Sequence, residues 1–174
     1  QVLKTLADCK LDERTIVMFL SDNGGPTREL TSSNWPYRGE KGELTEGGIR
    51  VPWLVHWKGT IPGGQVYTNP VISLDVAATA NAMAGLPTDP MLDGVNLIPQ
   101  LSGKSPTPPH DILFWRWVGQ YAVRQGDWKY IFLVGDNRQY LFNLATDPEE
   151  QHNLLTQQPE LAKSLHAKLE HWSQ

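Results

Sequence analysis

The stretch TIVMFLSDNGG, residues 15–25, joins an apolar run to a carboxylate, an amide and two glycines. The run TIVMFLS, residues 15–21, is mostly apolar or β-branched, which is typical of a strand buried on both faces of a parallel sheet. Asp22 and Asn23 would then follow at the carboxyl end of that strand, where α/β folds bind their ligands. We therefore expect an α/β fold with a candidate site directly after this strand.

The side chains of Asp22 and Asn23 both offer hard oxygen atoms, which select Ca²⁺ or Mg²⁺ over softer metals. Gly24 and Gly25 allow a sharp turn and the close approach of a ligand. Calcium takes about six to eight oxygen ligands, so these two side chains would need further ligands from elsewhere. The alternative is a plain turn, because Asp-Asn-Gly-Gly after a strand is also good turn chemistry.

A second stretch, YRGEKGELTEGGIRVP (residues 37–52), places basic side chains among glycines. Glycines let backbone N–H groups approach a ligand, and a lysine adds a point charge, so the pattern is typical of an oxyanion receptor. A metal ion beside it would neutralise an anionic group and act as a Lewis acid. The basic residues are Arg38, Lys41 and Arg50. The alternative is a solvated surface turn in which Lys41 pairs with a glutamate of the same stretch: Glu40, Glu43 or Glu46.

Aromatic residues lie before the lysine and again later in the chain. Trp35 and Tyr37 could form a wall that stacks on a sugar or aryl ring. A later aromatic run could do the same from the C-terminal part: Trp115, Arg116 and Trp117. Packing in the core or in an interface is the alternative for each tryptophan.

The flanking patterns predict the rest of the α/β part. Residues 2–14 begin with a short helix, and VPWLVHW, residues 51–57, reads as a second buried strand. We expect the two strands to be adjacent in one mostly parallel sheet, with the helix leading into the first of them. A further helix is predicted within 73–85, with Ser73 as its N-cap and Gly85 just after its end.

The C-terminal part has a different pattern. Four short aromatic and β-branched runs, separated by turn residues, predict an antiparallel meander from residue 111 onward. The tail predicts a helix that covers the sheet with one apolar stripe. That stripe is Leu161, Leu165, Leu169 and Trp172. The predicted domains are thus 1–110, part of an α/β domain, and 111–174, a small antiparallel-sheet subdomain.

Composition limits the function classes. The net charge is −4, from 19 acidic and 15 basic residues, which gives no electrostatic footprint for nucleic acid. No apolar run is long enough to span a membrane. The single cysteine, Cys9, excludes a disulfide framework and a cysteine-based zinc site. The chain begins without Met inside an expected helix, and we expect it to be a portion of a longer protein.

Together, TIVMFLSDNGG and YRGEKGELTEGGIRVPWLVHW resemble the C-terminal half of type I sulfatases, the arylsulfatase-like members of the alkaline phosphatase superfamily. The resemblance continues through SLDVAATANAMAGLP, LDGVNLIPQLSG, AVRQGDWKYI and YLFNLATDPEEQHNL, and so covers essentially the whole chain. It implies part of an alkaline-phosphatase-like, mostly parallel sheet, followed by a small four-stranded antiparallel sheet with a C-terminal helix. It also implies a sulfated small molecule or glycan as substrate, and a periplasmic, extracellular or lysosomal location.

The resemblance assigns roles residue by residue. Asp22 and Asn23 match the calcium ligands of the family, and Lys41 matches the lysine that contacts the sulfate group. From the residues themselves, and not from the resemblance, substrate contacts are expected from Arg38, Trp35 and Tyr37. Positions that match parts shaping the loop and its return to the sheet are Glu46, Arg50 and Pro52.

The catalytic nucleophile of that family is a formylglycine, made from Cys or Ser in a C/S-x-P/A-x-R sequence. Cys9 lies in DCKLDE, without the Pro or the Arg, and no serine fits either. We therefore expect the nucleophile and the remaining calcium ligands upstream, an inactive 174-residue fragment, and self-association of that fragment through an exposed apolar edge near TIVMFL. Two alternatives stay open: a phosphodiesterase or phosphonate hydrolase of the same superfamily, against which Asn23 argues, and a non-catalytic docking module.

Overall fold

The computed structural model describes residues 1–174, which divide into two compact units. Unit 1 consists of residues 1–20 and 53–110, and unit 2 of residues 21–52 and 111–174. Residues 21–52, which carry both sequence motifs, therefore pack with the C-terminal sheet rather than with the strands that flank them. The predicted boundary at residue 110 coincides with the last residue of unit 1, whereas residues 21–52 belong to unit 2.

Unit 1 contains α1 (Val2–Asp8), β1 (Val17–Leu20), β2 (Trp53–His56), α3 (Asp75–Met83) and α4 (Ile98–Leu101). β1 and β2 form a two-stranded antiparallel sheet, in which Val17 pairs with His56 and Leu20 with Trp53. The prediction of two strands in a mostly parallel sheet is thus wrong for this chain. The physical reason is that the end of β1 lies beside the start of β2, and residues 21–52 connect the two. The strands therefore run in opposite directions, as in a wide hairpin.

The predicted burial of the first strand on both faces is also wrong within this chain. Phe19 is 63% exposed and its partner across the ladder, Leu54, is 62% exposed. The exposed pair leaves one face of this small sheet apolar and open to solvent. An apolar sequence pattern indicates which residues favour burial, but it does not supply the element that covers them.

Helix α3 agrees with the sequence prediction at its end and differs at its start. Gly85 follows the helix with a φ of +72°, the left-handed conformation that commonly ends a helix. The N-cap is Leu74 rather than Ser73. Asp75 accepts a hydrogen bond from the Ile72 N–H at 2.9 Å, so a carboxylate of the first turn satisfies the preceding backbone instead.

Unit 2 contains the predicted meander: β3 (Ile112–Trp117), β4 (Gln120–Gln125), β5 (Trp128–Leu133) and β6 (Arg138–Asn143). The four strands pair in sequence order, and every pair is antiparallel. This part of the fold prediction is confirmed, since each strand is joined to the next by a short turn that the sequence marks with Gly, Asp or Asn.

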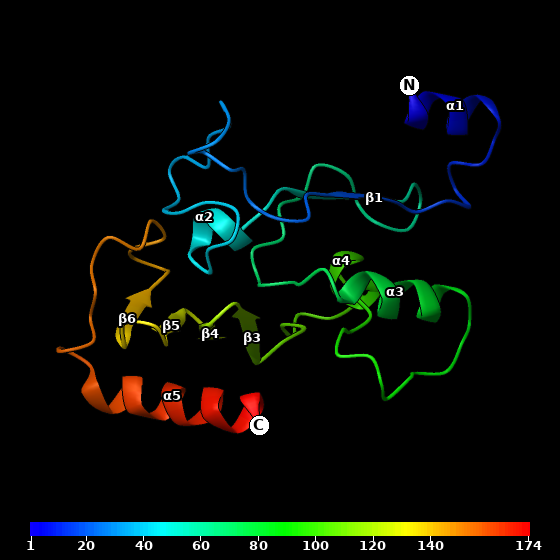
Figure 1. The fold of residues 1–174 in the computed structure, drawn as a ribbon. Helices are drawn as coiled ribbons and strands as arrows, with labels where there is room; N and C mark the ends of the chain where they lie inside the picture. Colours follow the sequence, from blue (N-terminus) through cyan, green and yellow to red (C-terminus); the bar gives the residue numbers. More distant parts are fainter. The chain divides into compact units, whose positions relative to one another are not determined.

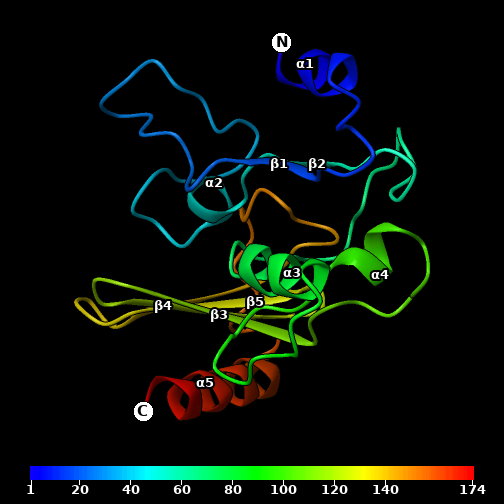
Figure 2. The same ribbon diagram turned by 90° about the vertical axis from the view of Figure 1, so that its right-hand side faces the viewer.

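Helix α5 (Pro159–Ser173) covers one face of this sheet, as Figures 1 and 2 show. Leu165 and Leu169 are buried against Val123, Tyr130 and Leu141 of the strands. Ala162 completes the buried stripe, and Leu161 is only partly buried. The predicted burial of Trp172 is wrong: it is 43% exposed, although its ring stacks on Phe114 with 5.1 Å between the centroids.

The opposite face of the sheet is covered by the segment that contains α2 (Glu46–Ile49). Leu44 and Ile49 pack there on Ala122, Ile131 and Phe142. Alternate residues of a strand point to opposite faces, so α5 and this segment bury different residue sets of the same strands. The motif that contains Lys41 is therefore held in place by packing against the sheet.

Candidate functional site

Backbone hydrogen bonds join the two motifs that the sequence singled out. The Lys41 N–H donates to the Gly25 carbonyl at 3.3 Å, and the Gly24 N–H donates to the Gly48 carbonyl at 2.8 Å. Asp22 precedes Gly25 by three positions, so chain geometry limits the Cα separation of these two residues to about 11 Å. The DNGG turn and the loop of residues 37–50, called here the lysine loop, thus form one structural feature.

Glycine is required where these segments cross. A Cβ on Gly24 would lie 1.8 Å from the Gly47 carbonyl oxygen, and a Cβ on Gly47 would lie 2.4 Å from that of Gly39. Real Cβ atoms do not approach backbone that closely, so any other residue would force the segments apart. The glycines of the two motifs serve close approach of backbone to backbone, a role the sequence analysis had assigned to the approach of a ligand.

Asn34 organises the same crossing and was not recognised from the sequence. Its amide nitrogen donates to the carbonyls of Gly25 at 2.9 Å and Gly39 at 3.0 Å, and its Oδ1 accepts from the Gly25 N–H at 2.8 Å. One side chain therefore bridges the start and the middle of the site. An asparagine in a long loop without periodicity is typical of an ordinary turn, so the sequence carried no signal for this role.

Lys41 is exposed, and its ammonium makes no ion pair or hydrogen bond within the chain. The proposed pairing with a neighbouring glutamate does not occur, because all three glutamates have other partners. Glu40 and Glu43 pair with Arg28 at 2.9 and 3.0 Å, and Glu46 pairs with Lys129 at 2.8 Å. The lysine loop therefore presents the Lys41 ammonium to solvent without a carboxylate partner.

Glu40 connects the lysine loop to Thr27 and Arg28, which follow the DNGG turn. One carboxylate oxygen accepts from the Arg28 N–H at 2.8 Å and from the Thr27 hydroxyl at 3.0 Å. The backbone N–H of Arg28 lowers the pKa of the Glu40 carboxyl, and the other contacts act in the same direction against its burial. Glu40, which the sequence analysis named as a candidate partner for Lys41, therefore anchors the loop instead.

A buried ion-pair network holds the lysine loop on the sheet. Lys129 of β5 is fully buried, and its Nζ lies 2.8 Å from Oε1 of Glu46 and 2.8 Å from Oε1 of Glu150. The second oxygen of Glu150 accepts from the Glu46 N–H at 2.7 Å. Arg50 lies 3.5 Å from the second oxygen of Glu46. These contacts connect the start of α2 to a strand and to the turn after β6.

Burial raises the pKa of the Glu150 carboxyl, although Lys129 opposes that shift. Its Oε1 contacts Lys129 as an ion pair without the alignment of a hydrogen bond. Two carboxylates share Lys129 as their buried cation, and only Glu46 has a second one, the exposed Arg50. Removing Glu150 from water therefore disfavours its charged form. The sequence analysis assigned a shaping role to Glu46 but did not identify Lys129 and Glu150 as its partners, which are distant along the chain.

Asp22 and Asn23 follow the end of β1 at Leu20, although the sheet there is antiparallel and not the predicted parallel one. Asp22 is exposed, and neither its carboxylate nor the Asn23 side chain has a hydrogen-bond or ion-pair partner within the chain. Hard oxygen atoms without partners are suitable for a calcium ion. No group of three or more His, Cys, Asp or Glu side chains gathers in the chain to hold a metal. These two side chains thus fit calcium as part of a ligand set.

The three predicted substrate-contact residues have different surroundings. Trp35 is 87% exposed, so it is not packed in a core. The Arg50 guanidinium lies 4.6 Å from the centre of the Tyr37 ring, and that of Arg38 lies 5.3 Å from the centre of the Tyr140 ring. Arg38 also donates to the Glu150 carbonyl at 3.2 Å. Tyr37 and Arg38 therefore already have partners that hold the lysine loop.

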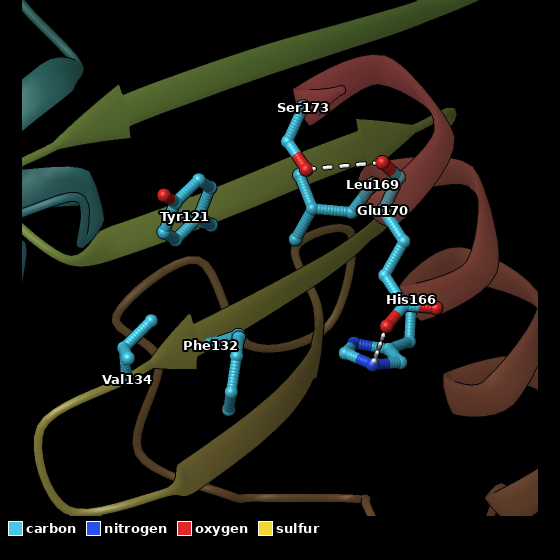
Figure 3. Close-up of a pocket in the computed structure, with 7 residues that line it drawn as sticks. All are labelled: Tyr121, Phe132, Val134, His166, Leu169, Glu170 and Ser173. Atoms are coloured by element: carbon cyan, nitrogen blue, oxygen red, sulfur yellow. Dashed lines mark hydrogen bonds and ion pairs between the residues drawn. The ribbon is translucent and has the colours of Figure 1, made fainter.

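A cavity in unit 2 lies between the sheet and α5, away from these residues (Figure 3). Tyr121 and Phe132 line its sheet side, and His166 and Glu170 of α5 line the other, 3.3 Å apart. It opens on the side of the sheet that α5 covers, whereas the lysine loop covers the opposite side. None of the predicted site residues contributes to it.

Comparison with known proteins decides the family. The family model described as Sulfatase matches residues 1–86. The chain belongs to the sulfatase family. It is 42% identical to steryl-sulfatase of Rattus norvegicus over 123 residues, which is 66% of this chain and 21% of that protein. It is 32% identical to N-acetylgalactosamine-6-sulfatase of Canis lupus familiaris over 152 residues, 84% of this chain and 29% of that protein.

Solved structures agree with this sulfatase assignment. The crystal structure of Ps i-CgsB superposes with a TM-score of 0.87 at 30% identity, covering 99% of this chain and 39% of that one. The same protein has been solved in complex with k-i-k-neocarrahexaose. The chain thus spans about a fifth to two fifths of the length of these relatives. No helix of the chain is long and apolar enough to cross a membrane.

Proposed function

We propose that the sulfatase containing this chain hydrolyses sulfate esters, and that the chain supplies one side of the sulfate-binding site. The observation that carries the proposal is the exposed Lys41 cation, which is held by backbone hydrogen bonds beside the DNGG turn and left without a carboxylate partner. A cation carried by an anchored backbone, near two partner-free oxygen ligands, suits a tetrahedral sulfate anion held jointly by lysine and metal.

In this proposal Lys41 binds an oxygen of the sulfate group and stabilises the negative charge that grows on the group as the ester bond breaks. The lysine loop is held by Glu40, Asn34 and the buried Lys129 network, so the backbone that carries Lys41 is positioned before the substrate arrives. Less of the loop then has to be ordered when the sulfate group binds.

Asp22 and Asn23 are proposed as two ligands of a calcium ion, with the remaining ligands outside this chain. When bound, the ion supplies Lewis-acid stabilisation of the sulfate oxygens. The nucleophile is proposed to be a formylglycine outside the 174 residues, because no C/S-x-P/A-x-R sequence occurs within them. Similarity to steryl-sulfatase, arylsulfatase D and N-acetylgalactosamine-6-sulfatase supports steroid-like, aryl or carbohydrate sulfates as the substrate range.

The test is a steady-state assay of the full-length protein with a chromogenic aryl sulfate and added calcium. Lys41→Ala is expected to lower kcat by about 10²-fold or more, as loss of a transition-state contact does. Lys163→Ala removes an exposed lysine from α5 and should leave kcat unchanged. Equal activity of Lys41→Ala and wild type would overturn the assignment of Lys41.

The 174-residue chain alone is expected to turn over no sulfate ester, since the nucleophile is absent from it. Turnover of the aryl sulfate by the purified chain, with calcium and without any further segment, would contradict the proposed location of the nucleophile. A full-length protein that hydrolyses phosphate diesters but not sulfate esters would instead support the phosphodiesterase alternative.

A further inference from the structure

We propose that Trp117, with Val118 beside it, forms the apolar wall that binds the ring of a ring-bearing sulfate ester. This inference rests on the proposed function, because it places the rest of the substrate beside the lysine that binds the sulfate group. The chemistry concerned is a ring with an apolar face, which both aryl sulfates and sugar sulfates possess.

The first observation is position. Trp117 ends β3, and a Cβ built on Gly42 would lie 3.7 Å from its Nε1, so the indole lies directly beside the residue that follows Lys41. Trp115 and Trp117 point to the same face of the sheet, since they are two residues apart. Trp115 packs on the core beneath the lysine loop, whereas Trp117 lies at the edge of that loop.

The second observation is a fixed connection between the β3–β4 turn and the lysine loop. Gln120, which pairs with Trp117 across the turn, donates from its amide nitrogen to the Gly42 carbonyl at 2.8 Å. Its Oε1 accepts from the Leu44 N–H at 3.2 Å. One side chain thus binds the loop on both sides of Glu43. The position of Trp117 relative to the Lys41 backbone is therefore set by the fold.

The third observation is the exposure of the Trp117 and Val118 side chains, which do not pack in the core of unit 2. Trp117 is 54% exposed and Val118 is 82% exposed, so two large apolar side chains at the end of β3 face solvent, and Trp117 adjoins the lysine loop. Val118 has a φ of +38° and Gly119 of +75°, the positive values that a two-residue hairpin turn requires. Asn or Gly would make this turn without strain, whereas a β-branched residue is unfavourable there. The turn itself gives no reason for an apolar side chain at its tip, and contact with a ligand would supply one.

The charges nearby favour the same reading. The exposed ammonium of Lys41 attracts the anionic end of a substrate, and the indole face offers no charge to compete for it. A substrate with one anionic group and one apolar ring face would contact both at once. Removal of the indole should therefore weaken binding of the ring and leave binding of the sulfate group intact, whereas removal of Lys41 should weaken both.

The experiment compares three variants of the full-length protein: Trp117→Ala, Trp117→Phe and Trp172→Ala. Two esters, a chromogenic aryl sulfate and a monosulfated hexosamine, supply the ring-bearing arms. Inorganic sulfate, measured as a competitive inhibitor, is the ring-free probe. Trp117→Ala is expected to raise KM about tenfold for at least one ester, the size of a lost aromatic contact, with kcat nearly unchanged.

In Trp117→Ala the inhibition constant of inorganic sulfate should stay within about twofold of wild type, since the ring-free probe does not contact the indole. In Trp117→Phe the KM should return most of the way to the wild-type value, because a flat apolar face remains. The control Trp172→Ala removes a comparably exposed indole, 43% exposed, from α5 and should leave both constants unchanged. A KM change for the aryl arm or the sugar arm identifies which ring the wall binds.

Two results would overturn the inference. Unchanged KM for both esters in Trp117→Ala would show that the indole contacts no substrate. An equal rise in KM and in the inhibition constant of sulfate would show that Trp117 only supports the lysine loop. If the wild-type protein hydrolyses neither ester, the proposed function itself fails, and that outcome is visible before any variant is compared.

Discussion

In unit 1, Phe19 and Leu54 face each other across the β1–β2 ladder with about three fifths of each side chain exposed. In unit 2, Val123 and Tyr130 face each other across the β4–β5 ladder and are completely buried. Both pairs are apolar and both ladders are antiparallel. The difference lies in what covers them, because α5 packs on the second pair and no element of unit 1 packs on the first.

This comparison shows that the chain contains one sheet whose apolar residues are buried and one sheet with an exposed apolar face. The sheet of unit 2 is covered by α5 on one face and by the lysine loop on the other, so its core also supports the candidate site. The paired strands of unit 1 present apolar side chains that this chain does not bury. Four predictions test the contrast, in order of decreasing expected effect.

Lys129→Ala should have the largest effect on stability. It removes the buried cation shared by Glu46 and Glu150 and leaves both carboxylates buried without it, which costs about 3–5 kcal/mol. The matched variant in unit 1 is Lys58→Ala, where an exposed lysine pairs with Asp12 at 2.8 Å. Its effect should be a small fraction of the first, because water screens surface pairs. Urea denaturation measures both, and comparable losses would contradict the contrast.

A pair of identical substitutions tests the two sheets directly. Leu165→Ala in α5 empties a fully buried site and should lower the free energy of unfolding by about 2–5 kcal/mol. Leu54→Ala in β2 removes an exposed side chain and should change it by less than about 0.5 kcal/mol. A large loss from Leu54→Ala in the full-length protein, but not in the 174-residue chain, would reveal a segment that covers the β1–β2 face.

Two acids of the turn after β6 should show opposite pH dependence. Burial raises the pKa of Glu150, so its favourable contribution is present at low pH and is lost as the pH rises from about 4.5 through the folded-state pKa. Burial also tends to raise the pKa of Asp147, but hydrogen bonds from the Gln151 and His152 N–H groups outweigh this and lower it. Its contribution is therefore present above the unfolded-state pKa and is lost as the pH falls.

The corresponding measurement is the free energy of unfolding of wild type minus that of Glu150→Gln and Asp147→Asn, between about pH 3 and 7. The difference from Glu150→Gln should fall with rising pH, and the difference from Asp147→Asn should rise. Slopes of the same sign for both variants would show that the buried network does not raise the pKa of Glu150.

The smallest effect on stability is expected from Phe19→Ser, since the side chain is 63% exposed. Its consequence should instead be association: an open apolar strand face favours contact between copies of the chain. Sedimentation velocity of the 174-residue chain should show less self-association in Phe19→Ser. Val66→Ser, which removes another exposed apolar residue, at 87%, outside the strands, serves as the control and should leave association unchanged.

The sequence by itself determined the elements whose pattern is local. Alternating apolar runs with short turns specified the β3–β6 meander, and Leu165 and Leu169 at helical spacing specified the buried face of α5. The two motifs around Asp22 and Lys41 were also recognisable, because their glycines and charges occur in short, continuous stretches. The family resemblance rested on those same stretches and was confirmed by comparison.

Only the tertiary structure decided how β1 pairs with β2. It also decided that Lys41 has no carboxylate partner, and which residues support its loop. Lys129 and Glu150 reach Glu46 from 83 and 104 positions away, and Gln120 reaches Gly42 from 78 positions away. Local pattern carries no information about partners at such separations. Whether a lysine is neutralised, or an apolar strand is covered, depends on what the fold brings against it, since charge and burial are properties of the surroundings and not of the residue.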